Sequence, residues 1–296
     1  MSELVVQVKN LTHHYGKKCV FENMNFEIKQ GSIFGLLGKN GTGKTTTINI
    51  LNGFLEPSSG QCLVFGEDSH NLSPQTKAKV GFLIEGHIQY SFMNIKQIEK
   101  YYSAFYKGWK KEAYWELMNK LQVTENQKIS KMSCGQRSQV ALGLLLAQNP
   151  DLLILDDYSM GLDAGYRRLF IDYLAEYIKA EGKTIFITSH IIQDLEHLLD
   201  DCVILDYKTV LLTMRIQDFL RDFKQYKFEV TNGNVAFTKN ETIKNFEVIK
   251  NKVTLYSFSG VDEIESYLKN SGVEYNNLKQ VEMSLEDAFI GLTGKY

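Results

Sequence analysis

The sequence is poor in proline and cysteine and has no long hydrophobic run. Three prolines and four cysteines are spread over 296 residues, and no two cysteines form a C-x-x-C pair. This spacing indicates reduced thiols rather than a disulfide framework or a zinc site. No stretch approaches the ~18–20 apolar residues of a membrane-spanning helix, and the first residues alternate like a strand rather than a signal peptide. We therefore expect a cytoplasmic chain, with any membrane-spanning part supplied by another subunit.

The chain also lacks a strong charge of either sign. Its net charge is −2 at pH 7, with 33 basic and 35 acidic side chains. It therefore has no basic surface in bulk of the kind that binds nucleic acid, and we expect no nucleic-acid partner. With 44% hydrophobic residues, the chain is long enough for one large domain with its own core and a smaller second one.

A phosphate-binding loop is the strongest signal in the sequence. Residues 38–45 read GKNGTGKT and match the pattern G-x-x-x-x-G-K-[ST]. The apolar run at 33–37 predicts a buried strand before the loop, and residues 45–51 predict a helix after it. Glycines let backbone N–H groups turn inward around an anion, Lys44 reaches the terminal phosphates, and the Thr45 hydroxyl binds Mg²⁺. We therefore expect this protein to bind a nucleoside triphosphate.

The hydrophobic pattern along the first two thirds of the chain is typical of an α/β fold. Short apolar runs, such as residues 152–155 before Asp156, suit parallel strands that are buried on both faces. Residues 86–147 change to helical spacing, which predicts a helical subdomain. Further strands are expected at 4–9, 19–28, 61–65 and 183–188, a helix at 167–180, and a hairpin at 203–206 and 210–213. The alternation predicts a mainly parallel sheet flanked by helices, in a domain of residues 1–214.

Beyond residue 214 the pattern shifts to shorter elements. Strands are expected near 227–230, 246–249 and 253–258, and helices at 216–223, 261–269 and 285–292. We interpret residues 215–296 as a small C-terminal α+β accessory domain.

Several further motifs follow the phosphate-binding loop in a fixed order. They are Tyr15-Gly16 before the loop, and Ser133-Cys134-Gly135-Gln136, residues 152–156, Gly161-Leu162-Asp163 and His190 after it. Together they resemble the ATP-binding subunit of a bacterial ABC transporter, similar to the ATPases of bacitracin, drug and peptide export. The resemblance covers about residues 1–214.

The resemblance implies a P-loop ABC-type ATPase core that hydrolyses Mg-ATP and drives transmembrane permease subunits. Two such ATPases, as a homodimer or a heterodimer, would form a head-to-tail sandwich on the inner face of the membrane. The expected nucleotide-binding residues are Tyr15, Gly38, Lys39, Asn40, Gly41, Thr42, Gly43, Lys44, Thr45, Thr46, Ser133, Cys134, Gly135, Gln136 and Asp163. The expected catalytic residues are Lys44, Glu85, Asp157 and His190, and the expected Mg²⁺ ligands are Thr45, Glu85 and Asp156.

Three positions depart from the family pattern. Asp157 stands where the family usually has glutamate, which shortens the reach of the expected base and predicts slow hydrolysis. Glu85 occupies the Q-loop position, and Cys134 replaces the first glycine of the signature. An alternative is therefore a regulatory or degenerate half of a heterodimer with little hydrolysis. A soluble ABC ATPase outside transport is a second alternative, but the chain has no room for a second such domain or a long coiled coil.

Two side-chain groups are open to more than one interpretation. For the pair His13-His14 we favour an exposed loop over a metal site, because no carboxylate or cysteine lies at ligand spacing in the sequence. For the aromatic cluster Tyr101, Tyr102, Phe105, Tyr106 and Trp109 we expect that most of the rings fill the core of the helical subdomain rather than contact a membrane subunit. Tyr90 and Phe92 are the better candidates for contact with a membrane subunit.

Overall fold

The computed structural model describes the chain in six stretches and divides it into two compact units. The described residues are 3–84, 90–121, 123–159, 162–189, 191–231 and 236–294. The units are Met1–Thr213 and Met214–Tyr296. Each unit is described by itself below.

The centre of the first unit is a six-stranded sheet with the order β10-β9-β3-β8-β7-β6. Its strands are β3 (Ile33–Gly38), β6 (Val80–Leu83), β7 (Leu152–Leu155), β8 (Thr184–Ile187), β9 (Asp201–Asp206) and β10 (Thr209–Arg215). β3, β6, β7, β8 and β9 are parallel to their neighbours in this set. β7 and β8 are buried at every position, as expected for parallel strands covered on both faces. The predicted parallel core is confirmed.

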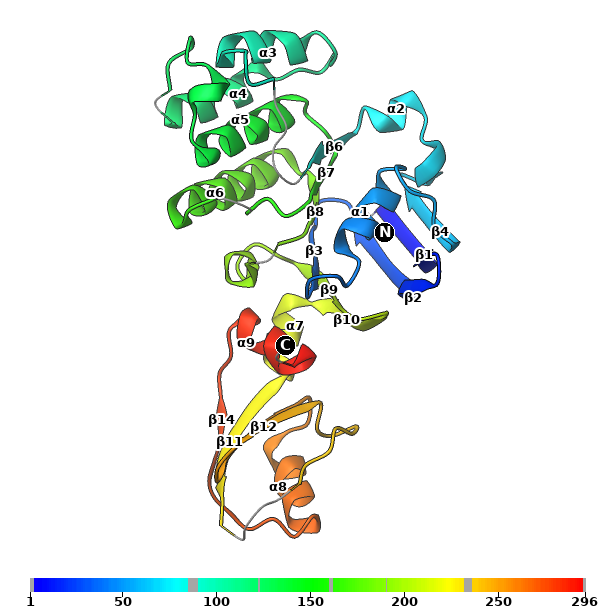
Figure 1. Ribbon diagram of the computed structural model, residues 1–296, viewed down its shortest axis with the longest axis vertical. Coiled ribbons are helices and arrows are strands. Elements are labelled where there is room, and N and C mark those ends of the chain that lie inside the picture. Colours follow the sequence, from blue (N-terminus) through cyan, green and yellow to red (C-terminus); the bar gives the residue numbers. More distant parts are fainter. Residues whose placement is uncertain are drawn as a thin grey trace. The chain divides into compact units, whose positions relative to one another are not determined.

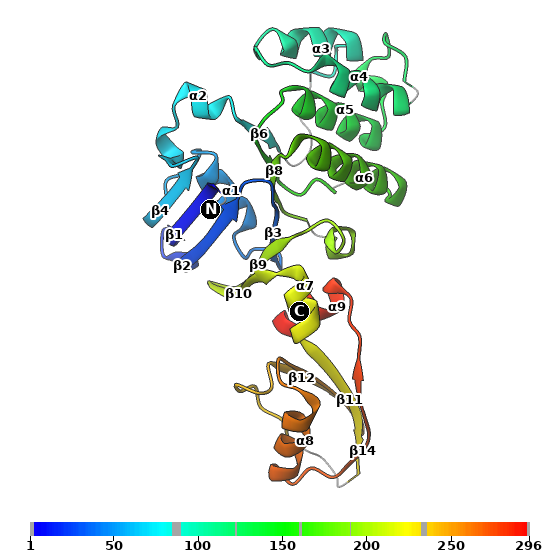
Figure 2. The same ribbon diagram turned by 180° about the vertical axis from the view of Figure 1, so that it is seen from behind.

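A second, antiparallel sheet lies beside the first. Its strands are β1 (Leu4–Tyr15), β2 (Lys18–Lys29), β4 (Ser59–Val64) and β5 (Glu67–Asp68), in the order β2-β1-β4-β5. Helix α1 (Lys44–Leu51) lies between the two sheets in both views (Figures 1 and 2). The buried rings of Phe26, Phe34 and Phe186 stack with centroid distances of 5.4–6.2 Å and join β2, β3 and β8.

Helices α5 (Cys134–Ala147) and α6 (Ala164–Glu181) cover the other face of the six-stranded sheet, and α3 (Ile95–Ser103) and α4 (Lys111–Lys120) pack beside α5 in the helical subdomain (Figure 1). Short 3₁₀ turns lie at Ile129–Lys131 and Ile192–Leu195. The short helix α2 (Pro74–Lys77) and the 3₁₀ turn Ser69–Asn71 precede β6 and lie on the same side of the sheet as α1 (Figure 1). Figure 1 shows α5 and α6 on the face opposite α1. From Val140 to Ala147, α5 is apolar on every side and is buried there. The Tyr114 hydroxyl, buried in α4, donates to the Ile95 carbonyl (2.9 Å) at the start of α3.

The second unit is a four-stranded antiparallel sheet with helices. Its elements are α7 (Ile216–Asp222), β11 (Lys224–Val230), β12 (Asn245–Ile249), β13 (Lys252–Ser257), α8 (Val261–Asn270), β14 (Tyr275–Val281) and α9 (Leu285–Thr293). The strand order is β12-β13-β11-β14. Ile264 and Leu268 of α8 pack on Tyr226, Phe228 and Leu255 of the sheet to form a separate core. The predicted α+β character is confirmed, but β14 was missed.

None of the described helices is both long and apolar enough to serve as a membrane span.

We predict that the Phe26–Phe34–Phe186 stack is a main source of stability in the first unit. Phe186→Ala should lower the free energy of unfolding by about 3–5 kcal/mol, because it leaves a cavity between the two sheets. Phe186→Leu fills most of that space and should cost less than half as much. Urea unfolding of the two variants and wild type checks this, and equal losses in the two variants would contradict it.

Candidate functional site

Three chain segments leave the carboxyl ends of adjacent parallel strands and meet at one edge of the six-stranded sheet. The phosphate-binding loop follows β3, Asp156 and Asp157 follow β7, and Thr188 follows β8, which lies between β3 and β7. In open α/β sheets this edge is where ligands bind. The order of the strands therefore brings together residues that are more than 100 positions apart in sequence.

The phosphate-binding loop requires glycine at the residue before α1. Gly43 has φ +101° and caps the helix from the left-handed region. A Cβ atom there would lie 2.7 Å from Val20 Cγ1 and 2.8 Å from Phe21 Cδ1, so any side chain would push the loop away from β2. The helix N-terminus, with its free backbone N–H groups, is thereby fixed in place.

Lys44 is the first residue of α1, and its ammonium is buried at the mouth of the loop. Nζ donates to the carbonyls of Gly38 (2.7 Å) and Lys39 (3.1 Å). Burial lowers the pKa of Lys44, and the charges of Asp157 and Asp156 oppose that shift. The cation is thus held within reach of an anion by backbone acceptors and two nearby carboxylates.

The two carboxylates are buried, and Thr188 connects the Asp156 carboxylate to the backbone of Asp157. The Thr188 hydroxyl donates to Asp156 Oδ1 (3.0 Å) and accepts from the Asp157 backbone N–H (3.0 Å), while Ser159 Oγ donates to Asp157 Oδ1 (3.0 Å). Burial raises the pKa of Asp156, and the charge of Asp157 adds to this. Hydrogen bonds from Thr188 and Thr45 and the charge of Lys44 act in the opposite direction. Without a further cation nearby, this environment therefore favours the neutral, protonated form of Asp156 over the charged one.

The donor set beside Asp156 fits a magnesium ion. The Thr45 hydroxyl lies near enough to the Asp156 carboxyl group to lower its pKa, and both side chains line the same cavity, so two hard oxygen ligands are close together. Mg²⁺ is usually held by one or two such ligands together with water and substrate phosphates. A divalent cation would also offset the buried negative charge.

A single cavity brings together seven of the fifteen predicted nucleotide-binding residues with Asp156 and Asp157. It is lined by Tyr15, Lys18, Val20, Asn40, Gly41, Gly43, Lys44, Thr45, Thr46, Asp156, Asp157 and Thr188. Tyr15 is 51% exposed and rests edge-on against His13, with ring centroids 4.7 Å apart. Sequence reasoning missed Lys18, Val20 and Thr188. Thr188 could have been found, since it is the last residue of a predicted strand and Asp156 directly follows another.

The signature residues and Asp163 lie elsewhere in the first unit, at the starts of two helices. Ser133 caps α5 and forms a capping box with Gln136, and Cys134 is exposed. A Cβ at Gly135 would lie 2.3 Å from Tyr166 Cδ2, so this glycine is required for packing on α6. Asp163 caps α6 by accepting from the Tyr166 N–H (3.0 Å). None of these residues lines the cavity around Lys44.

Three other sequence-predicted residues cannot be placed. Glu85, Gly161 and His190 lie outside the described residues, and their roles stay predictions.

Comparisons with known proteins agree with this arrangement. The family model described as "ABC transporter" matches residues 21–159. A relative from Methanocaldococcus jannaschii, described as an uncharacterized ABC transporter ATP-binding protein, is 34% identical over 238 residues, 78% of this chain and 84% of the relative. The chain belongs to the ABC transporter ATP-binding proteins.

Two further comparisons concern length and fold. The bacitracin transport ATP-binding protein BcrA of Bacillus licheniformis is 28% identical to this ABC ATPase over 98% of this chain and 97% of the relative. A solved ATP-binding subunit of an ABC transporter has the same fold, with a TM-score of 0.65 and 23% identity, covering 73% of this chain and 92% of that one. The match with BcrA extends over both units.

The pair His13-His14 differs from what the sequence suggested. Both residues lie within β1 rather than in a loop, and His13 is buried. His14 has Cys19 directly across the sheet and Glu22 nearby, so a cysteine and a carboxylate do lie within ligand reach. The expectation was wrong because spacing along the chain does not report cross-strand neighbours.

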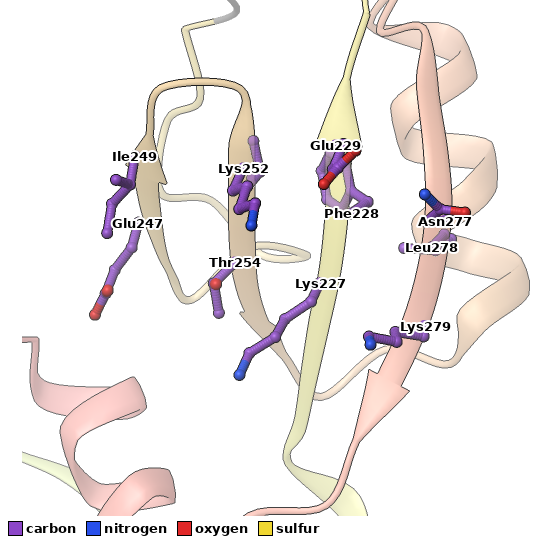
Figure 3. A pocket seen from close by; sticks show the side chains of 11 residues that line it. Lys227, Phe228, Glu229, Glu247, Ile249, Lys252, Thr254, Asn277, Leu278 and Lys279 are labelled. Carbon is purple, nitrogen blue, oxygen red and sulfur yellow. The ribbon is translucent and has the colours of Figure 1, made fainter.

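The second unit has a hollow of its own on the open face of its sheet. Figure 3 shows side chains from all four strands lining it, among them Lys227, Lys252 and Lys279 with Glu229 and Glu247. Charges of both signs alternate across this face. The hollow therefore does not select a charged ligand of one sign.

We predict that Asp156 destabilises the nucleotide-free protein although it is needed for binding of Mg-ATP. Because folding raises the pKa of Asp156, this group contributes least stability at high pH, where it is ionised. Its contribution should increase as the pH falls through the folded pKa towards the ordinary carboxyl range. Asp156→Asn should therefore raise the midpoint of thermal unfolding at pH 7–8 when no nucleotide is present. Added Mg-ATP should raise the midpoint of wild type but not that of the variant. A lower midpoint without nucleotide would contradict this interpretation.

Proposed function

We propose that this ABC ATPase binds and hydrolyses Mg-ATP and thereby drives an exporter through dimerisation of two ATPase subunits. The observation that carries the proposal is the single cavity in which the phosphate-binding loop, Lys44, Thr45, Asp156 and Asp157 meet, with Tyr15 at its rim. Each part of the proposal rests on particular side chains.

Binding uses groups that the fold already holds in place. The start of α1 directs backbone N–H groups and Lys44 into the cavity, where they attract phosphate oxygens. The exposed ring of Tyr15 offers a flat face to a purine. Thr45 and Asp156 would hold Mg²⁺, which supplies positive charge to the phosphates when it is bound.

Hydrolysis requires a group that orients the attacking water, and Asp157 is the candidate. Its carboxylate lies in the same cavity as Lys44 and is held by Ser159 Oγ (3.0 Å). In phosphoryl transfer the main contributions are positioning and charge stabilisation, so Lys44 stabilises charge on the transferred group while Asp157 directs the water. Glu85 and His190 are proposed to assist from the segments after β6 and β8.

The location of the signature supports a dimer. Ser133, Cys134 and Asp163 are exposed at the N-termini of α5 and α6 and do not line the cavity that contains Lys44. A helix N-terminus attracts phosphate groups. Because the starts of α5 and α6 do not line the cavity of their own chain, they are proposed to contact the nucleotide that a second subunit binds. The second subunit is either another copy of this chain or a related ATPase.

A patch of exposed aromatic rings supports contact with a permease. Tyr90, Phe92, Tyr101 and Phe105 form consecutive edge contacts, and Phe92 and Phe105 are 68% and 66% exposed. The expectation that Tyr101 and Phe105 fill the subdomain core was therefore wrong. Exposed aromatic clusters of this kind mark interaction sites, which suits docking of a transmembrane subunit to the helical subdomain.

Export is favoured by the relative that matches over nearly the whole chain. The bacitracin transport protein shares both units with this chain, since the match covers 98% of it. We accordingly place the protein on the cytoplasmic face of the membrane, held there by its permease. The alternative of a regulatory half with little hydrolysis is favoured by Cys134 and Asp157, and turnover decides between the two.

We predict that the length of the side chain at position 157 limits turnover. Asp157→Glu should raise the steady-state rate of Mg-ATP hydrolysis and lower the thermal midpoint, because φ at this residue is +42° and glutamate is less tolerant of that region than aspartate. Asp157→Asn should lower the rate about 10²-fold or more, and Lys44→Ala should abolish it. Purified wild type with no turnover but intact ATP binding would indicate the regulatory role instead.

We predict that ATP protects Cys134 from alkylation. Cys134 is exposed, whereas Cys62 and Cys202 are buried, so a Cys19→Ser background leaves one reactive thiol. In this background with Asp157→Asn, which retains ATP, labelling of Cys134 should slow once the dimer closes. Equal labelling rates with and without Mg-ATP would contradict the placement of Cys134 in a composite site.

A further inference from the structure

The hairpin that carries Tyr15 contains a β-bulge near its turn. β1 and β2 are antiparallel, with His14 opposite Cys19 but His13 opposite Phe21, so Val20 is an extra residue on β2. A bulge of this kind changes which face of the strand the following side chains occupy. The backbone N–H of Glu22 is held by the Lys208 carbonyl (3.0 Å) just after the bulge.

The bulge places three side chains that can bind a metal ion on one face of the hairpin. Residues three apart on a regular strand point to opposite faces, but the extra residue brings Glu22 to the side of Cys19. His14, directly opposite Cys19, is on the same face. The His14 Nε2 and Glu22 Oε1 atoms are 3.8 Å apart, and the ligand atoms of all three residues lie within 4.8 Å of one another. Among the described residues, no other trio of histidine, cysteine or acidic side chains comes this close.

We propose that His14, Cys19 and Glu22 form a binding site for a transition-metal ion, with Zn²⁺ as its natural occupant. One nitrogen, one sulfur and one carboxylate oxygen suit a borderline-soft cation and do not suit Mg²⁺ or Ca²⁺. Three protein ligands leave the fourth tetrahedral position to water.

The side chains can close around such an ion with small movements. Zinc–ligand bonds of about 2.0–2.3 Å put neighbouring tetrahedral ligands about 3.3–3.7 Å apart, so the widest separation must shrink by about 1 Å. The side chains of His14 and Glu22 are 36% and 55% exposed and are therefore able to rotate. Lys208 is near enough for its charge to act on the Cys19 thiol, and this positive charge weakens cation binding.

The metal site shares its backbone with the nucleotide cavity. Tyr15 follows His14 directly, and Lys18 and Val20 flank Cys19, and all three of these neighbours line the cavity. A bound ion would cross-link the two strands beside Tyr15 and hold its ring in place. This coupling rests on the proposed ATP-binding function, whereas the metal site itself does not.

Metal binding to the untagged full-length chain without nucleotide tests the site. We expect one equivalent of Zn²⁺ to be taken from a chromophoric chelator, and Co²⁺ to give a thiolate-to-metal charge-transfer band. Cys19→Ser should remove the band and weaken Zn²⁺ binding by at least the 10–100-fold that loss of a supporting ligand partner costs. Glu22→Gln should weaken binding, and Lys208→Gln should strengthen it.

Matched variants separate this site from incidental binding. Cys134 is also exposed, and His70 also lies 3.4 Å from a glutamate, Glu56. Cys134→Ser and His70→Gln should therefore leave Zn²⁺ affinity and the Co²⁺ band unchanged. No stoichiometric Zn²⁺ uptake by wild type, or a Co²⁺ band that survives Cys19→Ser, would overturn the proposal.

The coupling is tested separately with a fluorescent ATP analogue in excess Mg²⁺. One equivalent of Zn²⁺ should tighten its binding severalfold in wild type and have no effect in Cys19→Ser. By linkage, the analogue should tighten Zn²⁺ binding by the same factor. Zn²⁺ binding without any change in nucleotide affinity would overturn the coupling, and absence of nucleotide binding at all would count against the proposed function alone.

Discussion

The site depends on the burial of one ammonium group beside two carboxylates. Lys44, Asp156 and Asp157 are all withdrawn from water, and loop carbonyls and the hydroxyls of Thr188 and Ser159 form hydrogen bonds with them. Buried charges of this kind are costly unless they are paired. The strand order, the glycine-dependent loop and the threonine after β8 hold these charges where phosphates and the proposed Mg²⁺ would complete the pairing.

The β1–β2 hairpin links this charged centre to its surroundings. It packs against Gly43 through Val20 and Phe21, which fixes the loop, and it presents Tyr15 at the rim of the cavity. The same bulge that adapts the hairpin to the loop also gathers His14, Cys19 and Glu22. The bulge is therefore associated with two features: on one face of the hairpin Val20 and Phe21 pack against the loop, and on the other the three side chains of the proposed metal site lie together.

The parts of this structure that the sequence predicted are those with strong local signals. The strands β3, β7 and β8 are short apolar runs, and the phosphate-binding loop has a specific spacing, so both were predictable from the residues alone. β14 was missed because its sequence, YNNLKQV, is mostly polar and the strand is largely exposed. The neighbours of His14 depend on pairing between bulged strands, which periodicity along one segment does not report, whereas Thr188 ends a strand that was predicted.

The backbone at Asp157 bears on how this protein could have diverged. A residue at φ +42° is most easily aspartate, asparagine or glycine, because their short side chains tolerate the left-handed region. A longer acidic side chain thus becomes fully favourable only after the turn following β7 changes its conformation. Replacement of aspartate by glutamate at this position is therefore most favourable when the turn changes with it, so two coordinated substitutions would serve it better than one.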